Sequence, residues 1–105
     1  MSKVIETVAL TRMEKGYQIL GKRWSGLIIY TLMAEPKRFS EIHARIHVLS
    51  KRMLNERLKE LESCGIVIRN VIVDRPVRIE YSLTRMGSEL ATALKPVEEW
   101  SNKWL

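Results

Sequence analysis

The chain has 105 residues, of which 46% are apolar and 29% are charged, and its formal net charge at pH 7 is +6. This length supports one small domain, residues 1–105, and the composition excludes a disordered chain. No apolar run approaches the roughly 20 residues that cross a bilayer, and the N-terminus lacks a signal-peptide pattern. The single cysteine, Cys64, cannot form an intramolecular disulfide. We therefore expect a cytoplasmic protein with no membrane partner.

The positive charge is unevenly distributed along the chain. Residues 1–78 contain fifteen of the eighteen Lys and Arg residues but only eight of the twelve Asp and Glu residues, and the remainder is slightly acidic. This excess of positive charge favours binding to a polyanion such as nucleic acid, because neutralising phosphates releases counterions. Charge alone leaves open the alternative of a basic surface that is merely solvated.

Apolar spacing predicts two helices in the first third of the chain. Residues 3–20 repeat apolar side chains at helical intervals, and Gly21 ends this first helix. The dense apolar run from Trp24 to Met33 predicts a second helix that is buried on most sides. Pro36 ends it, because proline disfavours a helical residue before it.

A helix-turn-helix is predicted over about residues 39–64. Its short first helix opens at Arg38 or Ser40, and Ser50 is a good N-cap for its second helix because the hydroxyl can accept an orphan amide hydrogen. At about 100° per residue, this second helix has a leucine stripe on one side and a polar face on the other. Gly65 can end it in a left-handed conformation. The stripe consists of Leu54, Leu58 and Leu61, and the polar face of Arg52, Asn55, Glu56 and Lys59.

A β-hairpin is predicted directly after this helix. The strands cover residues 66–73 and 77–83 and are rich in β-branched side chains. Pro76 belongs in the turn between them, where its missing amide does no harm. A hairpin at this place is the wing of a winged helix-turn-helix.

The last segment, residues 84–104, predicts one helix kinked at Pro96, with a broad apolar stripe. A chain of this size is not expected to leave such a stripe in water, so we expect it to join the N-terminal helix in a homodimer interface. The alternative is a helix folded back on its own core. Two copies would match the symmetry of two DNA half-sites. The expected interface residues are Ile5, Val8, Leu90, Leu94, Val97, Trp100 and Trp104.

The second helix of a helix-turn-helix enters the major groove of DNA with its N-terminal residues near base edges. Arginine can pair bidentately with guanine and asparagine with adenine, so Arg52 and Asn55 are the candidates for base readout. We expect Glu56 to pair with Arg52 at i,i+4, although it could also accept from a cytosine amino group. The other expected contacts, mainly to phosphates or an adjacent minor groove, are Lys37, Arg38, Ser40, Ser50, Lys51, Lys59, Arg75 and Arg78.

Reactive side chains are few. His43 and His47 have a spacing that can bind a metal, but only Glu41 or Cys64 could complete a site, so we expect two polar-face histidines beside the DNA. Cys64 is expected to be a packed structural thiol, because a helix C-terminus disfavours a thiolate. The sequence contains no nucleophile–base set, glycine-rich phosphate loop or paired carboxylates. We therefore expect no catalytic activity, metal or cofactor.

Several segments, taken in order, resemble the HxlR-type family of bacterial winged-helix transcriptional regulators over residues 11–104. The resemblance implies a homodimeric DNA-binding regulator, more commonly a repressor. It also implies that the N- and C-terminal helices form the dimer interface and that the helix beginning after Ser50 reads the operator. The segments are residues 20–24 (LGKRW), 38–42 (RFSEI), 50–54 (SKRML), 58–62 (LKELE) and 78–84 (RIEYSLT).

The chain departs from this family at the start of the first helix. Members commonly carry a cysteine followed by a proline there, and some use that cysteine to sense oxidants or electrophiles. Thr11 and Arg12 occupy the matching positions here, so the resemblance does not extend to that mechanism. Val73 and Val77 also replace prolines that often flank the wing tip.

The expected fold is mainly α with a small β-hairpin: a winged helix-turn-helix with added N- and C-terminal dimerisation helices. The expected function is binding to a roughly palindromic duplex DNA site in the nucleoid. One alternative is a protein-interaction module whose basic face docks an acidic partner. Another is a metal sensor, or a sensor of an unknown small-molecule effector, with a pocket between the dimer helices lined by Tyr17, Trp24 and Trp100.

Overall fold

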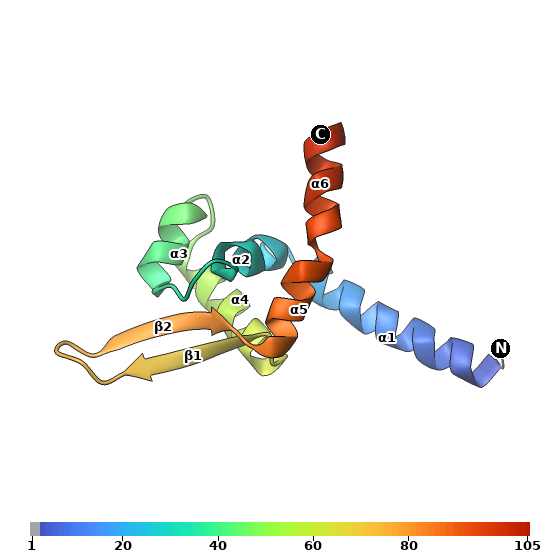
Figure 1. Ribbon diagram of the computed structural model, residues 1–105. Helices are drawn as coiled ribbons and strands as arrows, with labels where there is room; N and C mark the ends of the chain where they lie inside the picture. Colours follow the sequence, from blue (N-terminus) through green and yellow to red (C-terminus); the bar gives the residue numbers. More distant parts are fainter. Residues whose placement is uncertain (1–2) are drawn as a thin grey trace.

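The computed structural model describes residues 3–105, with side chains from Glu6 onward. Over this range the chain forms six helices and one two-stranded antiparallel sheet, which confirms the predicted mainly α fold class. In Figure 1, α2, α3 and α4 gather beside the sheet, whereas α1 and α6 extend away from them. The elements are α1 (Lys3–Gly21), α2 (Ser25–Leu32), α3 (Phe39–Arg45), α4 (Lys51–Ser63), β1 (Val67–Ile72), β2 (Arg78–Leu83), α5 (Arg85–Ala93) and α6 (Lys95–Trp104).

The ends of α4 form as the sequence predicts. The Ser50 hydroxyl accepts a hydrogen bond from the backbone N–H of Met53 at 3.1 Å, which satisfies one of the orphan amides of the first turn. At the other end Gly65 adopts a φ of 79°, a left-handed conformation that costs glycine little. The two ends of α4 are therefore determined by local contacts.

The leucine stripe of α4 lies in the core. Leu54, Leu58 and Leu61 are all buried, and they belong to one cluster with Ile28 and Ile29 of α2. Removing one such leucine side chain costs about 2–5 kcal/mol in typical cores. This packing turns the opposite face of α4 toward solvent.

The second helix is buried on most sides, as predicted, but leaves one strip exposed. Leu27 and Tyr30 of α2 are 50% and 57% exposed, while Ile28, Ile29 and Leu32 are buried. Five of its eight residues are buried, so the prediction of burial on most sides is confirmed and the exposed strip is the exception. The rest of the chain covers the other sides of this eight-residue helix, and the exposed strip carries large apolar side chains.

The sheet pairs β1 with β2 in the register Val67↔Leu83 through Ile72↔Arg78, so both strands are slightly shorter than predicted. A backbone bridge to the segment before α3 extends the sheet. Lys37 N–H donates to the Tyr81 carbonyl at 2.9 Å, and Tyr81 N–H donates to the Lys37 carbonyl at 2.8 Å. These two bonds join the wing directly to the helix-turn-helix.

The predicted single C-terminal helix is two helices, because α5 and α6 meet at Leu94. Pro96 lies in the first turn of α6, where no intrahelical amide is needed, so it starts a helix instead of kinking one. No residue of α6 is buried.

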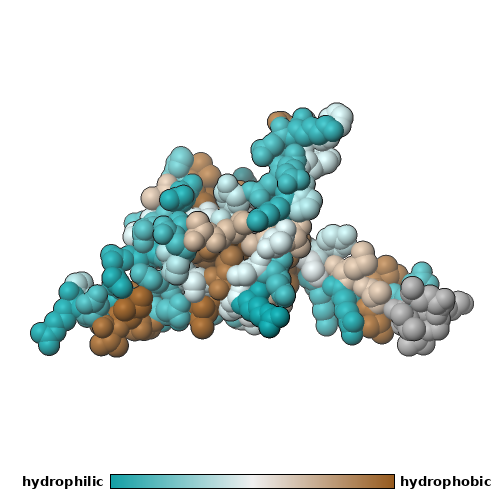
Figure 2. Space-filling view, viewed as in Figure 1, coloured by the Kyte–Doolittle hydropathy of each residue, from teal (hydrophilic) through white to brown (hydrophobic). Residues whose placement is uncertain are grey.

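The arm formed by α1 exposes its side chains over residues 6–18. Figure 2 shows hydrophobic side chains in brown and tan along this arm. Between residues 3 and 105 no helix combines the length and the apolar character that a membrane crossing requires.

Candidate nucleic-acid interface

The polar face of α4 is exposed as predicted. Behind it lies the buried leucine stripe, so the face is held on a rigid element while its side chains stay in solvent. Ser40 in the first turn of α3 and the capping residue Ser50 are also exposed. The exposed residues of α4 on this side are Lys51, Arg52, Asn55, Glu56 and Lys59.

Arg52 and Glu56 form the predicted i,i+4 ion pair, with Arg52 Nε 3.5 Å from Glu56 Oε1. The Arg52 side chain remains 90% exposed in this pair. Exposed pairs of this kind contribute less than about 1 kcal/mol, so Arg52 can exchange Glu56 for a base or phosphate at little cost. Glu56 thus holds the guanidinium near this face through a weak ion pair that a base or phosphate can replace.

The wing tip lies beside the start of α3. Arg38, Arg75 and Arg78 line one shallow groove of about 320 Å³. Arg75 is exposed, whereas Arg78 is half-buried and lies 3.6 Å from Asp74 and 3.7 Å from Glu80. Arg38 and Arg75 therefore offer exposed positive charge here, whereas Arg78 lies near two carboxylates within the wing.

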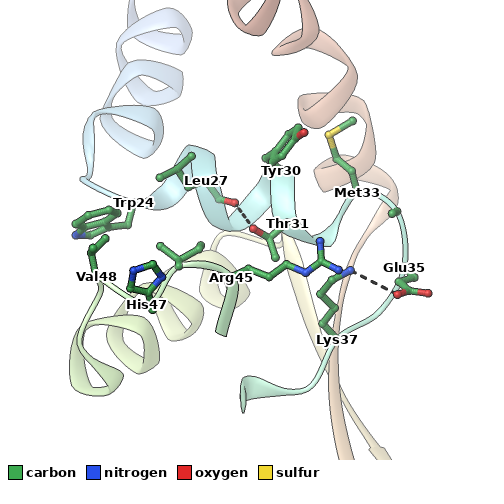
Figure 3. Close-up of a pocket in the computed structure, with 12 residues that line it drawn as sticks. Trp24, Leu27, Tyr30, Thr31, Met33, Glu35, Lys37, Arg45, His47 and Val48 are labelled. Atoms are coloured by element: carbon green, nitrogen blue, oxygen red, sulfur yellow. Dashed lines mark hydrogen bonds and ion pairs between the residues drawn. The ribbon is translucent and has the colours of Figure 1, made fainter. Parts of the chain in front are cut away.

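The prediction that Lys37 contacts phosphate is wrong. Its side chain is only 3% exposed, and its Nζ lies 3.8 Å from Glu35 Oε1. The backbone bridge to Tyr81 places Lys37 at the edge of the sheet, and its side chain turns inward to line a groove beside α2 (Figure 3).

The histidines do not form a matching pair on a polar face. His43 is half-buried, and its Nε2 lies 2.9 Å from the Leu49 carbonyl oxygen, so it holds the turn between α3 and α4. His47 is exposed. Within residues 3–105 no three His, Cys, Asp or Glu side chains gather closely enough to hold a metal ion.

The prediction that Cys64 is packed is also wrong, because this thiol is exposed. Cys64 caps the C-terminus of α4, and Gly65 then reverses the chain so that Ile66 enters the core. The apolar pattern continues through Ile66, not through the cysteine that precedes the turn.

Arg57 is a structural residue that sequence reasoning missed. Its Nε donates to the Arg23 carbonyl at 3.0 Å, and its NH1 group donates to both carboxylate oxygens of Glu60 at 3.1 Å. Lys22 approaches the same carboxylate at 3.8 Å. These contacts fasten α4 to the turn between α1 and α2. The i,i+3 spacing of Arg57 and Glu60 is a signal that could have predicted their pairing, but nothing in the sequence indicates the Arg23 carbonyl.

The expected dimer residues fall into two groups. Leu90 and Leu94 are half-buried and pack against the chain's own core. The side chain of Ile5 lies outside the described residues. The others are exposed large hydrophobic residues on α1 and α6: Val8, Val97, Trp100 and Trp104.

The proposed sensor pocket is not formed within one chain. Trp24 lines a groove with residues of α5 and α6, but neither Tyr17 nor Trp100 takes part in it. Tyr17 lines a separate shallow depression on α1.

A helix-turn-helix with an exposed basic face, followed by an arginine-tipped hairpin, defines a winged-helix DNA-binding protein. Comparison with known proteins agrees: the family model described as HxlR-like helix-turn-helix matches residues 19–105. The chain belongs to this family of helix-turn-helix transcriptional regulators, which confirms the resemblance seen in the sequence.

Two regulators of Bacillus subtilis (strain 168) are similar over most of their length. The HTH-type transcriptional regulator YvaP is 51% identical over 94 residues, which cover 90% of this chain and 87% of YvaP. The HTH-type transcriptional regulator YodB is 45% identical over 93 residues, which cover 89% of this chain and 83% of YodB.

Solved structures show the same fold. The reduced form of YodB superimposes with a TM-score of 0.81 at 45% identity, covering 89% of this chain and 91% of that one. The oxidised form of the redox regulator HypR gives a TM-score of 0.82 at 34% identity, and the match covers 88% of this chain and 95% of the HypR chain.

Proposed function

We propose that this regulator is a homodimeric repressor that reads a roughly palindromic duplex operator through α4. The observation that carries this proposal is the exposed basic face of α4, which is backed by buried leucines. Exposed Arg38 before α3 and Arg75 at the wing tip add positive charge. With no catalytic constellation in its sequence, the chain would act only by occupying DNA.

Each part of the interface would have a different task. Arg52 and Asn55 would reach base edges in the major groove, where each good bidentate contact discriminates by about 1–3 kcal/mol. Lys51 and Lys59 would hold phosphates, as would the small hydroxyls of Ser40 and Ser50. Arg38 and Arg75 would extend the contact toward the neighbouring backbone or minor groove.

Dimerisation is supported by the two helices that extend from the body. Trp100 and Trp104 of α6 are 56% and 66% exposed, and Val8 of α1 is also exposed. Large apolar side chains on projecting helices are typical of protein interfaces. The C-terminal segment is slightly acidic, which would keep this surface away from DNA.

Redox sensing is a property of some relatives. Solved forms of YodB include diamide-treated and quinone-bound structures, and HypR is a redox regulator. In this chain Thr11 lies in α1, where its hydroxyl donates to the Thr7 carbonyl, and the single cysteine is at the far end of α4. We propose that its signal does not act through a cysteine in α1.

The test is selection of bound sequences from random duplexes, followed by titration of the selected and scrambled sites. We expect two chains per selected duplex, clear discrimination between sequences and affinity that falls steeply with salt. Lack of binding at low salt would exclude the proposal. Equal, salt-sensitive binding to any polyanion would instead favour the acidic-partner alternative. A promoter–reporter fusion then distinguishes repression from activation.

A further inference from the structure

A groove of about 920 Å³ lies between α2 and the segment that links α3 to α4 (Figure 3). It is separate from the DNA-reading face of α4, and the proposed function does not use it. One wall is apolar and consists of Trp24, which precedes α2, and of Leu27 and Tyr30 of α2, faced by Val48. Leu27 and Tyr30 are the two α2 residues that the core leaves exposed.

The other end of the groove carries positive charge. In Figure 3, Lys37 and Arg45 extend toward the end where Glu35 lies, while Trp24, His47 and Val48 occupy the opposite end. Lys37 is buried, yet its ammonium group has only one partner among the described residues, the Glu35 carboxylate at 3.8 Å. That distance is longer than a hydrogen bond, so no described side chain or backbone group accepts a hydrogen bond from this ammonium group.

Arg45 adds a second cation to this end. It lies in the last turn of α3, is exposed, and forms no ion pair within the described part of the chain. Glu35 is the one acidic residue of the lining, and its side chain is 67% exposed. The ion pair between Lys37 and this exposed carboxylate is long and therefore weak. With two cations and one carboxylate, the charged residues of the lining carry a net positive charge.

We propose that this groove is an effector site for an organic carboxylate with an apolar body. The carboxylate would take the place of solvent near Lys37 and pair with the Arg45 guanidinium, which suits a bidentate acceptor. The apolar body would lie against Trp24, Leu27 and Tyr30. This combination of a mostly apolar concave wall and a few converging polar groups is typical of small-molecule sites.

The groove is placed to influence α4. Arg45, Ile46 and Val48 line it, and the same turn is held by the contact between His43 and the Leu49 carbonyl immediately before Ser50. A ligand that shifts Arg45 therefore acts on the turn that positions the N-terminus of α4. The effect on DNA binding rests on the proposed function, whereas ligand binding itself does not.

Calorimetric titration with 2-naphthoate and its neutral analogue 2-naphthamide tests the site. We expect one naphthoate to bind per chain, with the amide at least about tenfold weaker because it lacks the charge-assisted hydrogen bonds. Arg45→Gln should weaken naphthoate binding by about tenfold. Glu35→Gln should strengthen it, because the competing carboxylate is removed.

Lys37→Met should abolish the preference for naphthoate over the amide. Because Lys37 is buried, this variant could fail to fold, and Arg45→Gln then provides the test of the cationic end. Lys95→Gln, which removes an exposed cation outside the groove, is the matched control and should bind like the parent chain. The proposal is overturned if naphthoate does not bind at about 10 mM. Equal binding of acid and amide, or no response to Arg45→Gln, would also overturn it.

Anisotropy titrations with duplex DNA, with and without naphthoate, separate the two proposals. Naphthoate binding without any DNA binding would leave the site intact and refute the proposed function. DNA binding together with no binding of naphthoate would refute only the effector site. Where both bind, we expect saturating naphthoate to change DNA affinity in the parent but to have a reduced effect in Arg45→Gln.

Discussion

Gly87 of α5 lies so close to Ile66 that a Cβ atom on the glycine would be 2.1 Å from the Ile66 backbone oxygen. Thr84 reinforces this approach: its hydroxyl donates to the Gly65 carbonyl and accepts from Gly87 N–H at 3.1 Å. The start of α5 is therefore pressed against the chain reversal that ends α4.

Gly87→Ala should destabilise the protein, because the added methyl group meets backbone that cannot rotate away. We expect a loss of about 1–3 kcal/mol in the free energy of unfolding, measured by urea titration. Gly16→Ala is the matched control, since nothing lies within 4 Å of the methyl it adds. That change should be neutral or stabilising by up to about 1 kcal/mol, because alanine favours a helix more than glycine does. Equal effects of the two substitutions would contradict the close contact.

Base readout and phosphate contact should separate by mutation. Arg52→Ala and Asn55→Ala should each reduce discrimination at particular base pairs of the selected site by about 1–3 kcal/mol. Lys59→Ala should weaken all duplexes by a similar factor and reduce the salt dependence by about one counterion. The measurement is a titration of each variant against a panel of single-base substitutions.

Glu56→Gln is informative in the same panel. If Glu56 serves only the ion pair with Arg52, this substitution should leave base preference unchanged and raise nonspecific affinity slightly. A preference lost at a single cytosine would show that Glu56 reads a base instead.

Arg57→Ala should destabilise the fold without removing a proposed DNA contact. The substitution leaves the Arg23 carbonyl without its donor and removes the hydrogen bonds to Glu60, and we expect a loss of about 1–2 kcal/mol in urea unfolding. Arg69→Ala, at an exposed arginine of β1, should change stability by less than about 0.5 kcal/mol. Comparable losses in the two variants would mean that Arg57 does not fasten α4.

The exposed tryptophans of α6 provide a test of dimerisation. Trp100→Glu should shift the sedimenting species from dimer toward monomer and weaken binding to a full palindrome more than to a half-site. The control is Val71→Glu, at a similarly exposed apolar residue of β1, which should leave the oligomeric state unchanged. A parent chain that sediments as a monomer at all concentrations would exclude the homodimer.

Local signals predicted the helix-turn-helix well, because its determinants are short-range. The Ser50 cap, the leucine stripe of α4 and the Gly65 terminus each depend on residues within a few positions of one another. The exposed face that we propose reads DNA follows from that stripe by geometry. This is why the candidate residues of α4 were identified correctly as solvent-facing.

The errors concern long-range packing. The inward turn of Lys37 depends on its pairing with Tyr81, which is 44 positions away in the chain. The exposure of Leu27 and Tyr30 depends on how much of α2 its neighbours can cover. Periodicity along one segment contains no information about either, so the groove beside Lys37 could not be predicted.

The two backbone hydrogen bonds between Lys37 and Tyr81 hold the wing at a fixed distance from the helix-turn-helix. If α4 reads the major groove as proposed, the wing would meet the flanking backbone only where the DNA matches this distance. DNA whose minor groove narrows easily beside the site would fit this span with less deformation. Base pairs that no side chain touches would then contribute to operator choice, through their stiffness alone.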